Sequence, residues 1–186
     1  TKEFIKRSGE FTVNVALVDN HVPVLGVVHV PVSGVTYTGL SGGGAYKIEG
    51  DQPGQAIAVR SMSGRGETDK PVTVVASRSH GAGAVDDLLT RLAKDLGHTD
   101  TCNMGSSLKL CLVAEGSADI YPRLAPTMEW DTAAAQAVVE AAGGQVLNVD
   151  LELLRYNEKD ALLNPYFYVL GDTDFPWRDL LSGLDV

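Results

Sequence analysis

The stretch Pro126-Thr-Met-Glu-Trp-Asp131-Thr-Ala-Ala-Ala-Gln-Ala-Val-Val-Glu-Ala-Ala-Gly143-Gly144 combines a clearly patterned helix with a carboxylate at its beginning. Small apolar residues recur at helical spacing on one face, at Ala134, Ala137, Val138 and Ala141, and polar residues lie opposite them. Gly143 and Gly144 follow, and glycine readily takes the left-handed conformation that ends a helix. The sequence therefore predicts a helix over residues 132–142.

Asp131 is expected at the N-cap of this helix, where its carboxylate can accept hydrogen bonds from free backbone N–H groups. Capping alone is the commoner role of an aspartate in this position. Two features favour a functional role: the small helical side chains let other elements approach closely, and Pro126 and Trp130 fix the preceding loop. Asp131 is therefore a candidate metal ligand and catalytic residue.

The composition describes a globular protein without a nucleic-acid-binding surface. Of the 186 residues, 44% are hydrophobic, which is enough to build a core, and no apolar run is long enough to span a bilayer. The net charge of −9 argues against binding of a nucleic acid polymer, although it is compatible with a small phosphate pocket. Cys102 and Cys111 lack metal-ligand spacing, so we expect reduced packing residues in a cytoplasmic protein.

The first 60 residues predict an antiparallel meander. Residues 11–18 alternate with the period of a half-buried strand, and shorter strand candidates follow at 24–30, 34–38, 45–48 and 56–60. We expect residues 1–60 to be the remainder of an N-terminal sheet subdomain. Residues 61–70 are polar and rich in Gly, Ser and charge, and they are the best candidate for a linker.

From residue 71 onward, strands alternate with helices. The predicted order is a strand at 72–76, a leucine-rich helix ending at Gly97, a helix over 105–115, a strand at 118–121, the Asp131 helix, and strands at 145–149 and 166–170. Such alternation is typical of an α/β arrangement. We therefore expect an α/β subdomain over 71–186, and a layered α/β fold for the whole chain.

Ligands of α/β units bind near the carboxyl ends of strands and the N-termini of the helices that follow. This rule selects a set of polar residues: Ser77, Arg78 and His80 after one strand, Ser106 at the start of a helix, and Arg123 at the end of another strand. Taken one at a time, these residues have ordinary interpretations as turn serines, a loop histidine and surface arginines.

Lys109 is harder to explain without a ligand. A cation in the first turn of a helix opposes the helix dipole, at a cost of roughly 0.3 to 1 kcal/mol unless an anion is near. Helix N–H groups, Ser106, Lys109 and Arg123 together would form a phosphate site. Because Asp131 would repel that phosphate, a bridging magnesium ion is expected. This combination suggests metal-assisted hydrolysis of a phosphate ester.

Five motifs in order resemble the inositol monophosphatase-like superfamily, and more narrowly its CysQ-type 3'(2'),5'-bisphosphate nucleotidase branch. They are Thr1-Lys-Glu-Phe4, Ser77-Arg-Ser-His80, Gly105-Ser-Ser-Leu-Lys109, Tyr121-Pro-Arg123 and Trp130-Asp131-Thr-Ala-Ala. The resemblance runs essentially from end to end. It implies a partial αβαβα sandwich, in which an antiparallel meander is followed by a mixed α/β subdomain.

The resemblance also implies roles for single residues. Asp131 is implied as a magnesium ligand, and Thr1 as the residue whose hydroxyl orients the attacking water. The residues that would hold the nucleotide and the uncleaved phosphate are His80, Ser106, Lys109 and Arg123, flanked by Arg78 and Ser77. The implied reaction is hydrolysis of the 3'-phosphate of adenosine 3',5'-bisphosphate to AMP and phosphate, with inhibition by lithium.

The chain departs from the pattern at its beginning. The other acidic metal ligands of the superfamily would all precede Thr1. We therefore expect this chain to be the C-terminal part of such an enzyme, inactive or nearly so by itself. It should lack the elements that cover one side of the sheet over 11–30, and a separate N-terminal segment is an expected partner.

Three alternatives stay open. A phosphatase of the same superfamily could act on inositol phosphates or fructose bisphosphate. Thr1 could be an N-terminal nucleophile whose own amine serves as the base, although the other motifs would then have no purpose. The chain could also be a non-catalytic fragment that binds nucleotide phosphates.

Overall fold

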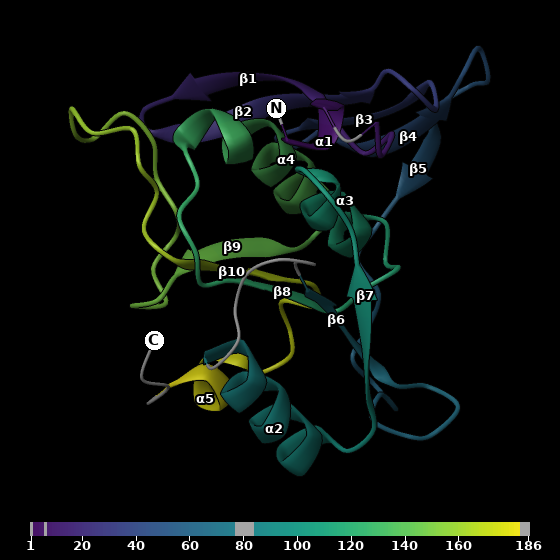
Figure 1. Ribbon diagram of the computed structural model, residues 1–186, viewed down its shortest axis with the longest axis vertical. Coiled ribbons are helices and arrows are strands. Elements are labelled where there is room, and N and C mark those ends of the chain that lie inside the picture. The colour runs from purple at the N-terminus through teal and green to yellow at the C-terminus, as the bar shows by residue number, and fades with distance from the viewer. Residues whose placement is uncertain (1, 6, 77–83, 183–186) are drawn as a thin grey trace.

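The computed structural model describes residues 2–5, 7–76 and 84–182. The helices are α1 (Lys2–Ile5), α2 (Ala84–Leu96), α3 (Leu108–Ala114), α4 (Glu129–Ala141) and α5 (Trp177–Leu181). Figure 1 shows the layers from top to bottom: a first sheet, then α3 and α4, then a second sheet, then α2 and α5. The layered α/β fold expected from the sequence is confirmed.

The first sheet is the predicted antiparallel meander. Its five strands follow the order of the chain: β1 (Val13–Asp19), β2 (Val22–Val30), β3 (Val35–Leu40), β4 (Gly44–Glu49) and β5 (Gln55–Ile57). The tight turn between β1 and β2 places Asn20 and His21 at positive φ, 48° and 69°. β5 ends at Ile57, earlier than predicted, because Arg60 is already hydrogen-bonded to Asp119 beside the second sheet.

The second sheet is mixed, with strand order β7-β6-β8-β10-β9. Its strands are β6 (Val72–Ala76), β7 (Thr99–Asn103), β8 (Ile120–Arg123), β9 (Gln145–Asn148) and β10 (Phe167–Leu170). β6 runs parallel to β7 and β8, whereas β10 runs antiparallel to β8 and β9. The sequence did not predict β7, because this edge strand is mostly polar and partly exposed.

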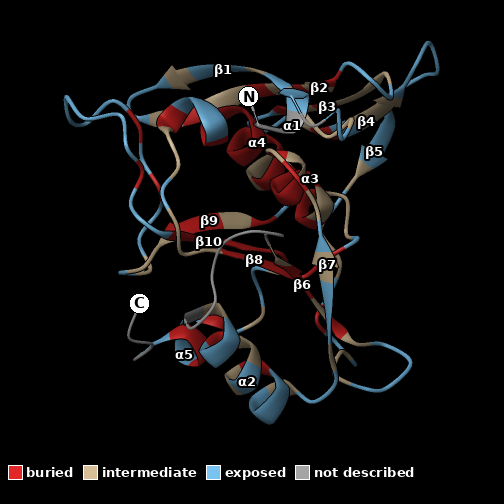
Figure 2. Ribbon diagram, in the orientation of Figure 1, coloured by how far each residue is buried: buried red, intermediate tan, exposed pale blue. Residues whose placement is uncertain are grey.

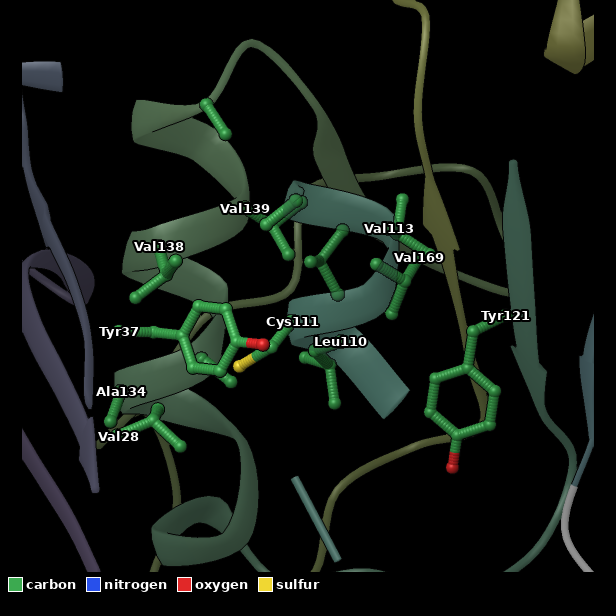
Figure 3. Packing of buried hydrophobic residues seen from close by; sticks show 14 of the residues in the cluster. Val28, Tyr37, Leu110, Cys111, Val113, Tyr121, Ala134, Val138, Val139 and Val169 are labelled. Carbon is green, nitrogen blue, oxygen red and sulfur yellow. The ribbon is translucent and has the colours of Figure 1, made fainter. Parts of the chain in front are cut away.

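Two glycines let α4 lie directly on the first sheet. A Cβ atom at Gly26 of β2 would lie 2.0 Å from the carbonyl oxygen of Ala134, and one at Gly39 of β3 would lie 2.5 Å from the Cα atom of Val138. The small side chains of α4 are therefore explained by close packing of the helix on two strands. Figure 3 shows the sheet residues Val28 and Tyr37 beside Ala134 and Val138.

The cysteines are free thiols, as expected. Cys111 of α3 is completely buried in the core between the two sheets, where Figure 3 places it beside Leu110 and Tyr37. Burial raises the pKa of the Cys111 thiol, and the nearby carboxylate of Glu115 raises it further. Cys102 lies half-buried on β7.

Residues 61–70 connect the two sheets and lie against the second one. Met62 is buried, and its backbone N–H donates to the Asp172 carboxylate over 2.8 Å. Gly66 lies so close to the end of α2 that an added Cβ would be 1.7 Å from the carbonyl oxygen of Leu96. The segment is thus fixed by contacts along its length, while the subdomain boundaries on either side of it stay predictions.

The first sheet has one buried face and one open face. Val28 and Val30 of β2 point toward α4 and are buried. On the other face, Val13, Val15 and Leu17 of β1 are 51%, 57% and 58% exposed, and much of β1 is accordingly pale blue in Figure 2. Nothing in the described part of the chain covers these apolar residues. None of the described helices is long and apolar enough to cross a membrane.

Candidate active site

Four of the predicted site residues, Thr1, Ser77, Arg78 and His80, lie outside the described residues. Their predicted roles in binding substrate and orienting water are therefore untested. The remaining four, Ser106, Lys109, Arg123 and Asp131, are all described. They come from the segment before α3, from α3 itself, from β8 and from α4.

Ser106 belongs to a cluster of hydroxyl groups at the start of β1. The Oγ1 atom of Thr12 lies 2.7 Å from the Oγ atoms of both Ser106 and Ser107. Ser107 also donates to the Oδ1 atom of Asn14 over 3.0 Å. Although Ser107 is the N-cap of α3, its side chain makes no capping bond. No sequence signal pointed to Thr12 or Asn14, because both lie more than 90 residues away in the chain.

Ser106 has a left-handed backbone, with φ of 51°. A residue with a side chain rarely takes this conformation, and such strain persists where surrounding contacts hold it in place. The hydrogen bond to Thr12 is one such contact. Backbone strain beside a polar cluster is a frequent property of functional sites.

Lys109 is buried, with 7% of the residue exposed, and its charge is held near electron-rich groups. Its Nζ atom donates to the carbonyl oxygen of Met104 over 3.3 Å. The same atom lies 5.6 Å from the centre of the Tyr121 ring, within the range of a cation–π interaction. A bound anion near Lys109 stays a prediction.

Arg123 lies on the same side of the second sheet as Tyr121, because residues two apart on a strand share a face. Burial raises the pKa of Tyr121 to about 12, and the positive charge of Arg123 counteracts part of that rise. The Tyr121 hydroxyl is therefore protonated at neutral pH. Tyr121 brings Lys109 and Arg123 to one place, a role that the sequence alone did not indicate.

One buried nitrogen of Arg123 lacks a hydrogen-bond partner among the described residues. An NH2 group of Arg123 donates to the carbonyl oxygen of Pro126 over 2.9 Å. The buried Nε atom has no hydrogen-bond partner in the described part of the chain. Because a buried donor without a partner is costly, this atom is a candidate donor to a bound group.

Asp131 is not at the N-cap, and this part of the prediction is wrong. α4 begins at Glu129, its N-cap is Met128, and Asp131 is the third residue of the helix. The Oδ2 atom of Asp131 accepts a hydrogen bond from the Met128 N–H over 3.1 Å, as the third residue does in a capping box. The helix starts early because the backbone before Asp131 pairs with residues 162–164.

The carboxylate of Asp131 fits a single position in a magnesium site. Asp131 is exposed, and its Oδ1 atom has no hydrogen-bond partner among the residues described. Magnesium usually takes one or two carboxylates and fills its other positions with water and phosphate oxygens. Within ranges 2–5, 7–76 and 84–182, no group of three or more His, Cys, Asp or Glu residues could hold a metal ion. The described residues therefore do not form a complete metal site, and Asp131 stays a predicted ligand.

A short loop joins Arg123 and Asp131. It runs from the end of β8 to the start of α4. The hydrogen bond from Arg123 to Pro126 fixes its first part, and the one from Met128 to Asp131 fixes its last. The two charged groups are therefore held at the ends of one ordered loop, although no direct contact joins them.

The chain belongs to the inositol monophosphatase family, whose sequence profile matches residues 1–172. It is 46% identical to the 3'(2'),5'-bisphosphate nucleotidase CysQ of Salmonella typhimurium over 169 residues, and 47% identical to that of Escherichia coli strain K12. Each alignment covers 91% of this chain and 63% of the relative. The chain thus spans less than two thirds of the length of these relatives.

Solved structures agree with this assignment. CysQ from Bacteroides thetaiotaomicron, described as a bacterial member of the family, superposes with a TM-score of 0.80 at 45% identity, covering 91% of this chain and 66% of that one. An inositol monophosphatase from Zymomonas mobilis gives 0.76 at 20% identity, covering 100% and 66%. The second likeness shows the fold alone. The predicted resemblance to CysQ-type proteins is confirmed.

Proposed function

We propose that the protein containing this chain hydrolyses the 3'-phosphate of adenosine 3',5'-bisphosphate to AMP and phosphate, with Mg²⁺ as its cofactor. The names of the relatives at 46% and 47% identity support this activity. The observation that carries the proposal within this chain is the arrangement of Lys109, Tyr121 and Arg123. A substrate with two phosphates needs a binding position for the one that is not cleaved, and two cations beside one aromatic ring can supply it.

In this proposal the chain binds and orients the substrate. Lys109 and Arg123 bind the 5'-phosphate, and the free Nε–H of Arg123 donates to one of its oxygens. Ser106, held by Thr12, donates from its hydroxyl to the nucleotide. Asp131 contributes one carboxylate oxygen as a metal ligand. When bound, Mg²⁺ would neutralise phosphate charge and lower the pKa of the attacking water.

The residues that the structure does not describe keep their predicted roles. Thr1 orients the attacking water through its hydroxyl, and His80 contacts the nucleotide. Arg78 and Ser77 flank the same pocket. Because Asp131 is a single carboxylate, we propose that the other metal ligands come from a further segment of the enzyme, and that this chain alone has little or no activity.

Substitution of Lys109 tests the phosphate-binding role. Lys109→Met keeps the length of the side chain and removes its charge, and Lys94→Met, on the exposed side of α2, is the matched control. A charge-assisted hydrogen bond is worth about 1.5 to 3 kcal/mol, so the Lys109 variant should bind adenosine 3',5'-bisphosphate at least about tenfold more weakly. Adenosine 3'-monophosphate, which lacks the 5'-phosphate, should bind both variants and the parent equally.

Calorimetric titration of the full-length protein measures these affinities. An equal loss for both nucleotides, or no loss for either, would contradict the assigned position of the 5'-phosphate. Faster turnover of inositol phosphates or fructose bisphosphate than of the bisphosphate nucleotide would favour the alternative phosphatase activity. Nucleotide binding without any turnover by the full-length protein would favour the non-catalytic alternative.

A further inference from the structure

A buried group of polar side chains lies directly behind Asp131, on the inner side of α4. Thr132, Tyr156 and Asn164 are 2%, 1% and 5% exposed. The Oγ1 atom of Thr132 is the centre of the group: Asn164 Nδ2 donates to it over 2.9 Å, and the Tyr156 hydroxyl lies 3.0 Å away. Thr132 in turn donates to the carbonyl oxygen of Glu129 over 3.2 Å. Two side chains of residues 154–164 therefore meet the helix α4 at one hydroxyl group.

The group continues along α4 to its second turn. The Tyr156 hydroxyl donates to Oε1 of Gln136 over 2.7 Å, and Nε2 of Gln136 donates to the carbonyl oxygen of Leu154 over 2.9 Å. Gln136 is itself 1% exposed. The side chains of one face of α4 thus bind the segment of residues 154–164 through hydrogen bonds that water does not reach.

Backbone hydrogen bonds fix the residues just before Asp131 to the same segment. The Glu129 N–H donates to the carbonyl oxygen of Leu162 over 2.9 Å, and the Asn164 N–H donates to that of Thr127 over 2.9 Å. Between them, Met128 and Leu163 form an antiparallel bridge. The Met128 N–H that binds the Asp131 carboxylate therefore belongs to a backbone that is itself held on both sides.

We propose that Thr132, Tyr156 and Asn164 are positioning residues that fix the direction of the Asp131 carboxylate toward the metal. This inference rests on the proposed function, because it takes Asp131 as a ligand. Thr127, which precedes Met128, and Thr132, which follows Asp131, are both hydrogen-bonded to the 154–164 segment. An apolar contact would pack α4 equally well, but hydrogen bonds of fixed direction select one orientation of the helix start. Groups that orient a metal ligand typically change metal affinity when they are removed.

The test uses single-group substitutions in the full-length protein, with all of its metal ligands. Thr132→Val removes the central hydroxyl and keeps the shape, whereas Thr132→Ser keeps the hydroxyl. Tyr156→Phe removes one further member. Tyr168→Phe is the matched control, because Tyr168 is 1% exposed and its hydroxyl makes no hydrogen bond in the described part of the chain. Asp131→Asn tests the ligand itself.

Two measurements read the effect without relying on turnover. Binding of Mn²⁺ in the presence of adenosine 3',5'-bisphosphate, followed by electron paramagnetic resonance, should weaken about tenfold in Thr132→Val and Tyr156→Phe. It should recover in Thr132→Ser and stay unchanged in Tyr168→Phe. Amide hydrogen exchange at Met128 should accelerate in the two weakened variants only, because that N–H reports the orientation of Asp131.

The outcomes separate the two proposals. If Asp131→Asn binds Mn²⁺ as tightly as the parent protein, the assigned ligand is wrong and the proposed function fails in that respect. If Asp131→Asn weakens binding while Thr132→Val and Tyr156→Phe stay within twofold of the parent, the positioning role is overturned and the function stands. A tenfold loss of Mn²⁺ affinity could also arise from global unfolding, but most of the variant protein would then be unfolded, which circular dichroism would reveal. Unfolding of the variants as the cause of the loss would also overturn the positioning role.

Discussion

Asp119 holds Arg60 through a two-pronged ion pair, in which the Nε atom and an NH2 group of Arg60 lie 2.7 and 2.6 Å from the two carboxylate oxygens. The side chain of Asp119 is completely buried and also accepts from the Thr73 N–H over 2.7 Å. This pair fixes the chain between the two sheets beside β6 and the start of β8, two interior strands of the second sheet.

Removal of the Asp119 carboxylate should strongly destabilise the protein. Asp119→Ala leaves Arg60 partly buried without its partner, and breaking a buried pair in this way costs about 3 to 5 kcal/mol. Glu158→Ala is the control, because it removes the exposed Arg155–Glu158 pair of 2.7 Å, worth about 1 kcal/mol or less. Urea unfolding of each variant measures the free energies. A loss for Asp119→Ala no larger than that of the control would disprove a structural role for the pair.

Addition of one methyl group at Gly26 should disturb the contact between α4 and the first sheet. The new Cβ would overlap the Ala134 carbonyl group, and backbone on both sides leaves little freedom to adjust. We expect Gly26→Ala to cost about 1 to 3 kcal/mol or more. Gly54→Ala is the control, since its nearest neighbour is a side-chain atom of Ile48 at 3.3 Å. Equal thermal stability of the two variants would show that α4 is not packed as described.

Asp172 should give a pH-dependent contribution to stability. Its pKa is lowered from the ordinary 3.8, chiefly by the hydrogen bond from the Met62 N–H. A carboxylate with a lowered pKa stabilises the folded state above its ordinary pKa, and this contribution is lost as the pH falls through the lowered value. Asp172→Asn should therefore be less stable than the parent at pH 7, and the difference should shrink below about pH 4. Denaturation curves of the variant and the parent between pH 2 and pH 7 measure this difference, and a difference that does not change with pH would contradict the role of the Asp172 carboxylate.

The two cysteines should differ in reactivity in the native protein. The thiolate is the reactive form, and burial keeps Cys111 protonated and out of reach of reagents. Cys102 is half-buried on the edge strand β7. Alkylation at pH 8 followed by peptide mass spectrometry should label Cys102 first, with Cys111 modified only after denaturation. Labelling of Cys111 at the faster rate would contradict the described core.

A substitution pair on the first sheet checks which of its faces is buried. Val28→Thr places a hydroxyl in the core and should cost about 1 to 3 kcal/mol. Val15→Thr, at a position that is 57% exposed, should change stability by no more than about 0.5 kcal/mol. Thermal unfolding distinguishes them. The reverse order would mean that the open face of β1 is covered in solution.

Local patterns predicted those elements whose structure depends on neighbouring residues in the chain. The meander follows from alternation and turn residues, and α4 follows from its small apolar face. The start of α4 could not be predicted, because residues 162–164 pair with the backbone before Asp131 and the sequence does not reveal that contact. The polar strand β7 was missed for a similar reason, since only its pairing with β6 defines it.

The candidate site could likewise be predicted only in part from the sequence. Ser106, Lys109 and Arg123 belong to family motifs and can be named from the sequence. Thr12 lies in no such motif and is connected to the site only by its 2.7 Å contact with Ser106. Tyr121 belongs to the same motif as Arg123, but its contact with Lys109, 5.6 Å from the ring centre to Nζ, becomes apparent only in the fold. Motifs therefore identify the charged groups, whereas the groups that hold them become apparent only in the folded chain.

The glycine contacts at Gly26 and Gly39 have a mechanical consequence. Because helix backbone lies against strand backbone at these glycines, we expect α4 to stay in place along β2 and β3. Since β1 pairs with β2, we expect the hydroxyl cluster at the head of β1 and the acid at the head of α4 to move together. Under the proposed function, we therefore expect any closure around the nucleotide to come from segments outside this pair.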